Sequence, residues 1–159
     1  MKTLLLKAVT VLLVAILSSC STEALDTGSI PQAKNSVGME SELLDLINAH
    51  RTEMGYPTLT FSEVAYDYAN RHTDYMIAMG TINHDNFSAR ASGISSEAHA
   101  TQVAENVANK YATAQRAFDE WLASDGHRKN MEGDFTHTAV SVKSDSSGTF
   151  YYTQLFYKR

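Results

Sequence analysis

The sequence predicts one α+β domain that follows an N-terminal targeting segment. Three observations carry this prediction: helical periodicity in three separate segments, one short alternating stretch, and a C-terminal run of β-prone aromatic residues around a polar turn. The chain has 159 residues, which is enough for one domain with a sizeable core. Cys20 is the only cysteine, so packing rather than disulfide bonds has to hold the domain together.

The first twenty residues resemble a bacterial lipoprotein signal. Two lysines give a positive start, an apolar run from Ala8 to Leu17 follows, and small residues precede Cys20. The run is shorter than a transmembrane helix requires. We expect a signal peptide over residues 1–19, then a lipidated Cys20 and a flexible tether over residues 20–38. An ordinary signal peptide followed by a chance cysteine is the alternative.

The mature chain is expected to be acidic. The formal net charge of the whole chain is −5. Two of the 13 Lys and Arg residues lie in the leader, so 11 remain beside 18 Asp and Glu residues, a net charge of −7. This balance argues against a nucleic-acid partner and against electrostatic attraction to anionic lipids. The membrane is expected to be reached through the lipid on Cys20, in the bacterial cell envelope, with the leaflet left open.

The first helix is expected over residues 40–54, because apolar side chains recur at helical spacing and Gly55 and Pro57 follow. Its apolar side consists of Leu43, Leu44, Ile47 and Met54. Arg51 lies near that side. We expect Arg51 to bond backbone carbonyls at the helix end or to pair with an acid, rather than to bind a ligand.

The second helix is expected to begin at a capping box formed by Thr60 and Glu63, and to end at Gly80. His72 lies on its apolar side, where a histidine is more often a satisfied core residue than a ligand. Residues 88–101 are polar and rich in serine, so they predict a loop with at most one helical turn.

Residues 103–108 predict a short strand that contains Glu105, an acid within a small apolar run. Such a glutamate is either exposed on an edge or held by a partner such as a histidine or a metal. Residues 138–142 and 150–157 predict a β-hairpin around the polar turn at 144–148. Both faces of the last strand carry large side chains, which suits a sheet that is covered on both sides.

The third helix is expected to start after Thr113, a good N-cap, and to stop at Gly126. Its apolar stripe consists of Ala114, Ala117, Phe118, Trp121 and Leu122. His127, Arg128 and Asn130 follow the predicted stop directly. We therefore expect a polar cluster beside the only tryptophan, at the end of this helix.

These segments, in this order, resemble the bacterial branch of the CAP superfamily, which covers cysteine-rich secretory proteins, antigen 5 and class-one pathogenesis-related proteins. The similarity extends from about Glu40 to Phe156. Its motif residues are Leu44, Ile47, Asn48, Arg51, Met76, Gly80, His84, Ala104, Glu105, Asn106, Val107, Ala108, Trp121, Ser124, Gly126, His127, Arg128, Asn130, Phe135 and the strand from Tyr152 to Phe156. The resemblance implies a three-layer α-β-α sandwich over residues 39–159.

The resemblance also implies a cleft with two histidines and two acids, which binds a divalent metal in some members. Carried onto this sequence, it gives His84, Glu105 and His127. The position of the second acid holds Ser124, so the implied ligand set is incomplete. Asn106, Arg128 and Ser124 are expected to support the cleft.

Two imidazoles and a carboxylate suit zinc with one position open to water. Their wide spacing in the sequence gives no local metal motif, and no residue is assigned a catalytic role. Three functions remain open. The first is a non-enzymatic module that binds a small ligand, a protein partner or a divalent metal. The second is a metal-dependent, peptidase-like hydrolase, and the third is a structural or adhesive envelope protein. We favour the first.

Overall fold

The computed structural model describes residues 30–159; the predicted signal peptide and Cys20 lie outside this part of the chain. None of the helices described in it is long and apolar enough to cross a membrane. In chain order the elements are α1 (Val37–Glu53), β1 (Thr60–Phe61), α2 (Glu63–Met79), α3 (Phe87–Ala98), β2 (Gln102–Asn109), α4 (Ala114–Ala123), α5 (Asp125–Met131), β3 (His137–Ser144) and β4 (Phe150–Lys158).

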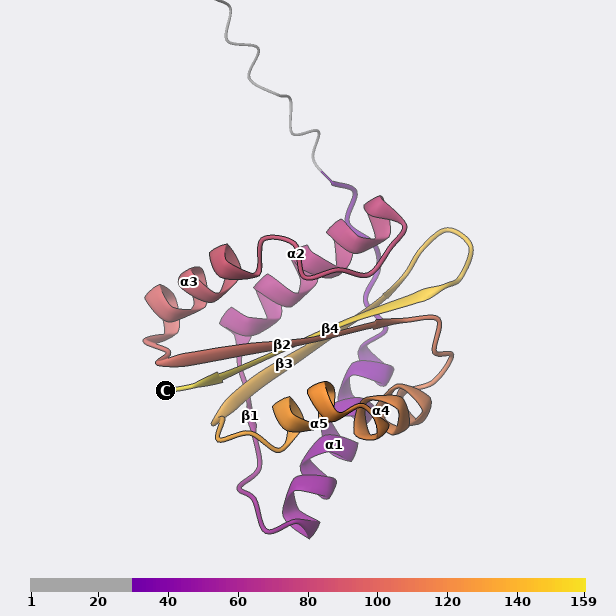
Figure 1. Cartoon of the computed structure of the whole chain (residues 1–159). Helices are drawn as coiled ribbons and strands as arrows, with labels where there is room; N and C mark the ends of the chain where they lie inside the picture. The colour runs from indigo at the N-terminus through magenta and orange to yellow at the C-terminus, as the bar shows by residue number, and fades with distance from the viewer. Residues whose placement is uncertain (1–29) are drawn as a thin grey trace, which may run out of the picture.

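The strands form one sheet in the order β1-β3-β4-β2, with β2 at a free edge. β1 runs parallel to β3, and the other neighbours are antiparallel. Helices α2 and α3 cover one face of the sheet, and α1, α4 and α5 cover the other (Figure 1). The predicted α+β class and the three-layer α-β-α sandwich are therefore confirmed.

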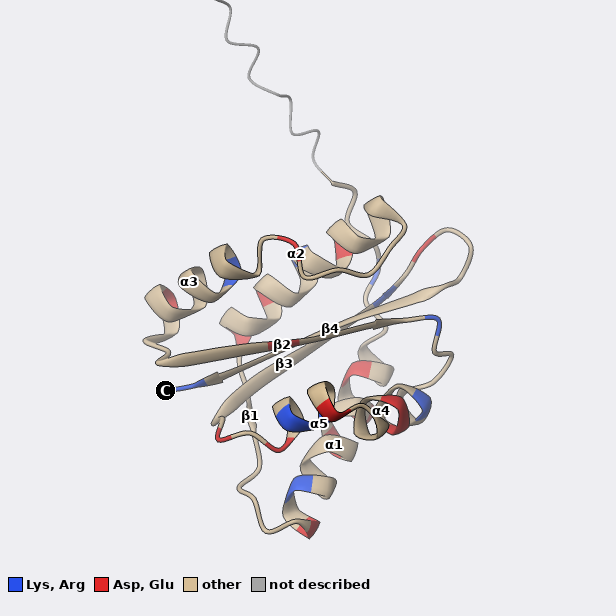
Figure 2. Cartoon of the chain, in the orientation of Figure 1, with Lys and Arg blue, Asp and Glu red and all other residues tan. Residues whose placement is uncertain are grey.

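Strand β4 is buried on both faces, as its large side chains predicted. Tyr152 and Phe156 pack in the core under α1 and α4, while Leu155 and Tyr157 pack in the core under α2. The predicted hairpin of β3 and β4 is present, with an unbroken register from His137 to Ser144. Charged residues of both signs are spread over the outer helices and the loops (Figure 2).

The loop predicted over residues 88–101 is wrong, because α3 occupies most of it. Arg90, Ile94 and Ala98 recur every four residues and are all buried, so packing outweighs the weak helix propensity of the serines. Gly93 allows close contact with α2: a Cβ atom there would lie 2.1 Å from the hydroxyl of Tyr68. The helix was not predicted because one of its buried positions holds the charged residue Arg90, which interrupts the apolar pattern.

The stop predicted at Gly126 is also wrong. Helix α4 ends earlier, Ser124 is extended with φ −92° and ψ 118°, and α5 begins at once with Gly126 inside it. Arg128 donates from Nη1 to the carbonyl of Leu122 at 3.2 Å, which satisfies an acceptor freed at the break. The predicted cap is confirmed, since the Thr113 hydroxyl accepts an N–H of the first turn of α4.

The starts of the first two helices differ slightly from the sequence prediction. Helix α1 begins at Val37, and the backbone before it already packs on the domain, where Asn35 forms a β-bridge with Lys143. The residue that caps α2 is Ser62 rather than Thr60. Thr60 pairs with β3 instead, because the two-residue strand β1 precedes the helix.

Candidate functional site

The carboxylate of Glu105 is the centre of a polar cluster between β2 and α3. Glu105 is 6% exposed, and Arg90 of α3 binds both of its oxygens. Arg90 donates from Nε to Oε2 and from Nη2 to Oε1, each at 2.8 Å. Two parallel bonds between a guanidinium and a carboxylate form a strong, geometrically specific pair. The pair neutralises the buried acid and fastens α3 to the edge strand.

His84 lies on the loop between α2 and α3, as predicted, and contacts Glu105. Its Nδ1 lies 2.8 Å from Glu105 Oε1. Because the carboxylate oxygen accepts, this contact assigns the proton to Nδ1. The side chain is 55% exposed, so the other ring nitrogen, Nε2, is free to accept a hydrogen bond from a ligand when the ring is neutral.

His72 lies beneath this cluster and is only 2% exposed. Its Nε2 lies 2.8 Å from the carbonyl of Asn83, which confirms the prediction of a satisfied core histidine. The same atom lies 3.8 Å from Glu105 Oε1. Burial lowers the pKa of His72, although the charge of Glu105 opposes this. His72 is therefore uncharged at neutral pH and supports the cluster without carrying a charge.

His127 lies on α5, in the opposite helical layer. Its half-buried ring packs against Trp121, with 6.2 Å between ring centroids. Burial, and then the nearby charge of His84, lower the pKa of His127. Within residues 30–159 no hydrogen bond joins its ring to His84 or Glu105. The reason is geometric: alternate residues of β2 face opposite sides, and Glu105 points toward α3.

Two asparagines fasten α5 to the edge strand. Asn130 donates from Nδ2 to the carbonyl of Glu105 at 3.2 Å and to Oδ1 of Asn106 at 2.9 Å. Asn106 in turn donates to the carbonyl of His127 at 3.2 Å. Asn106 was predicted to support the cleft, and these bonds give it a positioning role at the cleft border. Asn130 takes part in two of these three bonds, as Asn106 does.

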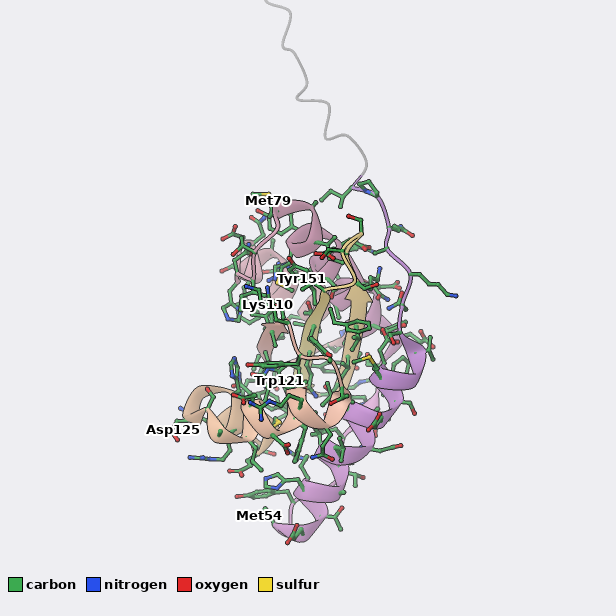
Figure 3. The ribbon with its side chains drawn as sticks, turned by 90° about the vertical axis from the view of Figure 1, so that its right-hand side faces the viewer. Met54, Met79, Lys110, Trp121, Asp125 and Tyr151 are labelled. Carbon is green, nitrogen blue, oxygen red and sulfur yellow. The ribbon has the colours of Figure 1, made fainter. Side chains whose placement is uncertain are left out.

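The other two supporting residues, Ser124 and Arg128, lie at the junction of α4 and α5. Arg128 donates from Nη2 to the carboxylate of Asp125 at 2.5 Å. Asp125 projects away from the body of the domain (Figure 3). Neither Ser124 nor Arg128 lines the hollow beside Glu105. Their contribution is to the helix break that orients His127.

A hollow of about 260 Å³ lies at the free edge of β2 and links the two helical layers. It is lined by His84, Phe87, Val103, Ala104, Glu105 and Asn130. His84 and Asn130 offer polar groups from opposite sides, and Phe87 and Val103 supply apolar surface. Such a mixed lining suits a small polar ligand with one apolar face.

The residues of this cluster, as placed, do not fit a divalent metal. Within residues 30–159 no three or more His, Cys, Asp or Glu side chains come together in a way that would hold a metal ion. Both oxygens of Glu105 accept from Arg90, so a fixed positive charge stands beside the only carboxylate of the set. Ser124 supplies no second carboxylate. The cluster is an ion pair flanked by histidines.

Comparisons with known proteins agree with the fold. The model of the Cysteine-rich secretory protein family matches residues 44–156. The uncharacterized membrane protein YlbC of Bacillus subtilis is 32% identical over 126 residues, which cover 76% of this chain and 34% of YlbC. This chain therefore spans about a third of the length of that relative.

Solved structures of other bacterial proteins are similar. An outer surface protein of Borrelia burgdorferi has a TM-score of 0.72 at 17% identity, covering 80% of this chain and 98% of that one. An extracellular protein of Bacillus anthracis with an SCP domain has a TM-score of 0.68 at 26% identity, covering 77% of this chain and 41% of that one. The family match spans both helical layers and every strand of the sheet. The chain belongs to the Cysteine-rich secretory protein (CAP) family.

Proposed function

We propose that this protein is an envelope-anchored binding module. In this proposal a lipid on Cys20 holds the domain at a membrane, and the hollow beside His84 binds a small polar ligand without chemical turnover. The observation that carries the non-enzymatic part is the two-bond pair of Arg90 and Glu105. A carboxylate whose two oxygens are engaged by a guanidinium is poorly placed to act as a general base or a metal ligand.

The histidines support the same proposal. A general base needs a partner that orients it toward the reacting proton. His84 has such a partner, but that partner is the neutralised Glu105. His127 has no orienting carboxylate within the described residues, since Glu105 points into the other layer. These groups offer hydrogen bonds to a ligand and lack the arrangement of a nucleophile with its base.

The proposed location is supported by the relatives. Their descriptions name a membrane protein, an outer surface protein and an extracellular protein. The leader of this chain, with small residues before Cys20, suits lipid attachment after export. Each relative is a different protein, so the anchor on this chain needs its own test.

Replacing Cys20 with Ser is expected to move the protein from the membrane fraction to the soluble fraction of expressing bacteria. The thiol is the attachment point in this proposal, and several acyl chains together hold a protein stably at a bilayer. Fractionation followed by intact-mass measurement would show the lost lipid mass. A variant at the neighbouring Ser21 is the matched control. Retention of Cys20→Ser in the membrane fraction would refute the lipid anchor.

The cleft is tested by two titrations of the full chain in a non-ionic detergent. N-acetylglucosamine, a neutral polar probe, is expected to shift the NMR signals of His84 and Asn130 with an affinity on the order of 1 mM. The double variant His84→Ala, His127→Ala is expected to lose this response, and His50→Ala is expected to keep it. No response in the wild type up to about 50 mM would count against a polar-ligand cleft.

Zinc is expected to bind the wild type and the double variant equally weakly. A single site of micromolar or tighter affinity (about −8 kcal/mol or more favourable) that only the wild type shows would instead establish a metal centre. Metal-dependent hydrolase activity would then be the function to assay.

A further inference from the structure

Arg51 is a buried cation that has no carboxylate partner in the described part of the chain. It lies in the last turn of α1 and is 1% exposed. Arginine is rarely buried to this extent unless an opposite charge accompanies it, because removing a charge from water is costly. Within residues 30–159 no Asp or Glu forms an ion pair with Arg51. Burial lowers the pKa of its guanidinium, and nearby Tyr56 and Asp134 oppose this only in part.

The partners of Arg51 are three backbone carbonyls. Its Nε donates to Pro57 at 2.8 Å, and its Nη1 donates to Met131 at 2.6 Å and to Gly133 at 2.9 Å. These bonds confirm the predicted structural role, since they fasten the loop after α1 to the loop after α5. They leave Nη2, with two N–H groups, without a partner in the described part of the chain.

Arg51 lines a hollow of about 470 Å³. Among the described residues, the fully enclosed side-chain polar atoms that lack a hydrogen bond are Trp121 Nε1 and Gln154 Oε1. Arg51 Nη2 is unpartnered but does not belong to this set, so it is reached from outside. The small exposed part of Arg51 therefore includes Nη2, and Arg51 lines the hollow.

The walls of the hollow are largely flat and apolar. Tyr56, Pro57 and Phe135 line it together with His137. The guanidinium lies over the Tyr56 ring at 5.7 Å from its centroid. The His137 ring is stacked on Tyr157, with 4.7 Å between centroids and 5° between planes. A planar group that enters here meets aromatic and proline surface on its faces.

Two acids at the rim could repel an anion, but each is engaged elsewhere. Asp134 forms an ion pair with Lys158, and Glu132 lies 2.9 Å from Nε2 of His50. Arg51 thus remains a buried cation that forms no ion pair within residues 30–159. A negatively charged ligand would give Arg51 an anionic partner, because a buried cation is stabilised by a hydrogen-bonded anion.

We propose that this hollow is a second binding site, for a small carboxylate joined to a flat apolar group, with the carboxylate accepting from Arg51 Nη2. No residue of this site lines the cleft beside His84, so the inference is independent of the proposed function. Planar arginine donors match carboxylate oxygens well. On the side of the guanidinium formed by Nε and Nη2, Nε already donates to Pro57 and Nη2 is open.

The test compares benzoate with benzamide, which have nearly the same shape and differ in charge. The full chain in a non-ionic detergent is titrated while NMR follows the Nε–H signal of Arg51, which is retained by its bond to Pro57. Benzoate is expected to give a saturable shift in the millimolar range, and benzamide is expected to bind about tenfold more weakly. Equal affinities, or no saturable shift up to about 50 mM benzoate, would overturn the proposal.

A filling variant checks the location without removing the structural arginine. Thr58 is exposed and lines the hollow, so Thr58→Trp is expected to weaken benzoate binding about tenfold. Ser146→Trp, in the exposed turn between β3 and β4, is the matched control and is expected to bind as the wild type does. Unchanged affinity in Thr58→Trp, with a native spectrum, would place any benzoate elsewhere and refute this site.

Discussion

Replacing Arg90 with Met is expected to lower the free energy of unfolding by about 3–5 kcal/mol, because it leaves a buried carboxylate without its cation. Glu105 is 6% exposed and receives two hydrogen bonds from Arg90. Methionine keeps much of the side-chain volume, so the loss comes from the uncompensated charge rather than from a cavity. Urea unfolding followed by circular dichroism would measure it.

The control for this experiment is an ion pair at the surface. Arg116 and Glu120 lie one turn apart on α4 at 2.6 Å, with side chains 63% and 36% exposed. Arg116→Met is expected to cost less than about 1 kcal/mol, because water screens exposed pairs. The double variant Arg90→Met, Glu105→Met should recover much of the loss, since both buried charges are gone. A loss below about 1 kcal/mol in Arg90→Met would contradict the neutralised carboxylate on which the proposed function rests.

Replacing Trp121 with Ala is expected to cost about 3–5 kcal/mol, the range for removing a large buried aromatic side chain. Trp121 is 1% exposed and lies between α4 and the sheet (Figure 3). It makes an edge contact with Tyr152 at 6.4 Å between centroids and also packs against His127. Its removal opens a cavity beside the helix that carries His127. Thermal and urea unfolding would both report the loss.

Trp121→Phe separates packing from hydrogen bonding in this prediction. The indole Nε1 has no hydrogen-bond partner among the described residues, so phenylalanine gives up volume but no bond. We expect a cost of about 1–2 kcal/mol. A cost for Phe equal to that for Ala would show that the indole nitrogen, rather than packing, stabilises this core.

Much of the fold was predictable because the spacing of apolar residues in the sequence reflects which side chains are buried. The stripe of α4 and the two-sided aromatic pattern of β4 place the same side chains in the core that the structure does. Helix α3 was not predictable in this way. One of its three buried positions is Arg90, and a charged side chain counts against burial until its partner on another element is known.

The candidate site was predictable only in part, for a similar reason. The resemblance placed His84 and Glu105 together, and their contact is present. It also implied a metal site. The sequence does not show that Arg90 binds the same carboxylate and leaves it poorly placed to bind a metal. Arg90 and Glu105 are 15 positions apart on a helix and a strand, so only the packing of α3 against β2 brings them into contact. The break at Ser124 likewise depends on a bond from Arg128 that no local pattern predicts.

The asparagine contacts between α5 and β2 have a consequence for self-association. A strand at the margin of a sheet presents backbone groups that invite pairing with another chain. Asn130 occupies the outward carbonyl of Glu105, and α5 stands beside that margin. Intermolecular strand addition along this part of β2 is therefore obstructed. In the proposed lipid-anchored state, where copies share one membrane surface, such protection would keep neighbouring copies from joining edge to edge and leave the cleft open.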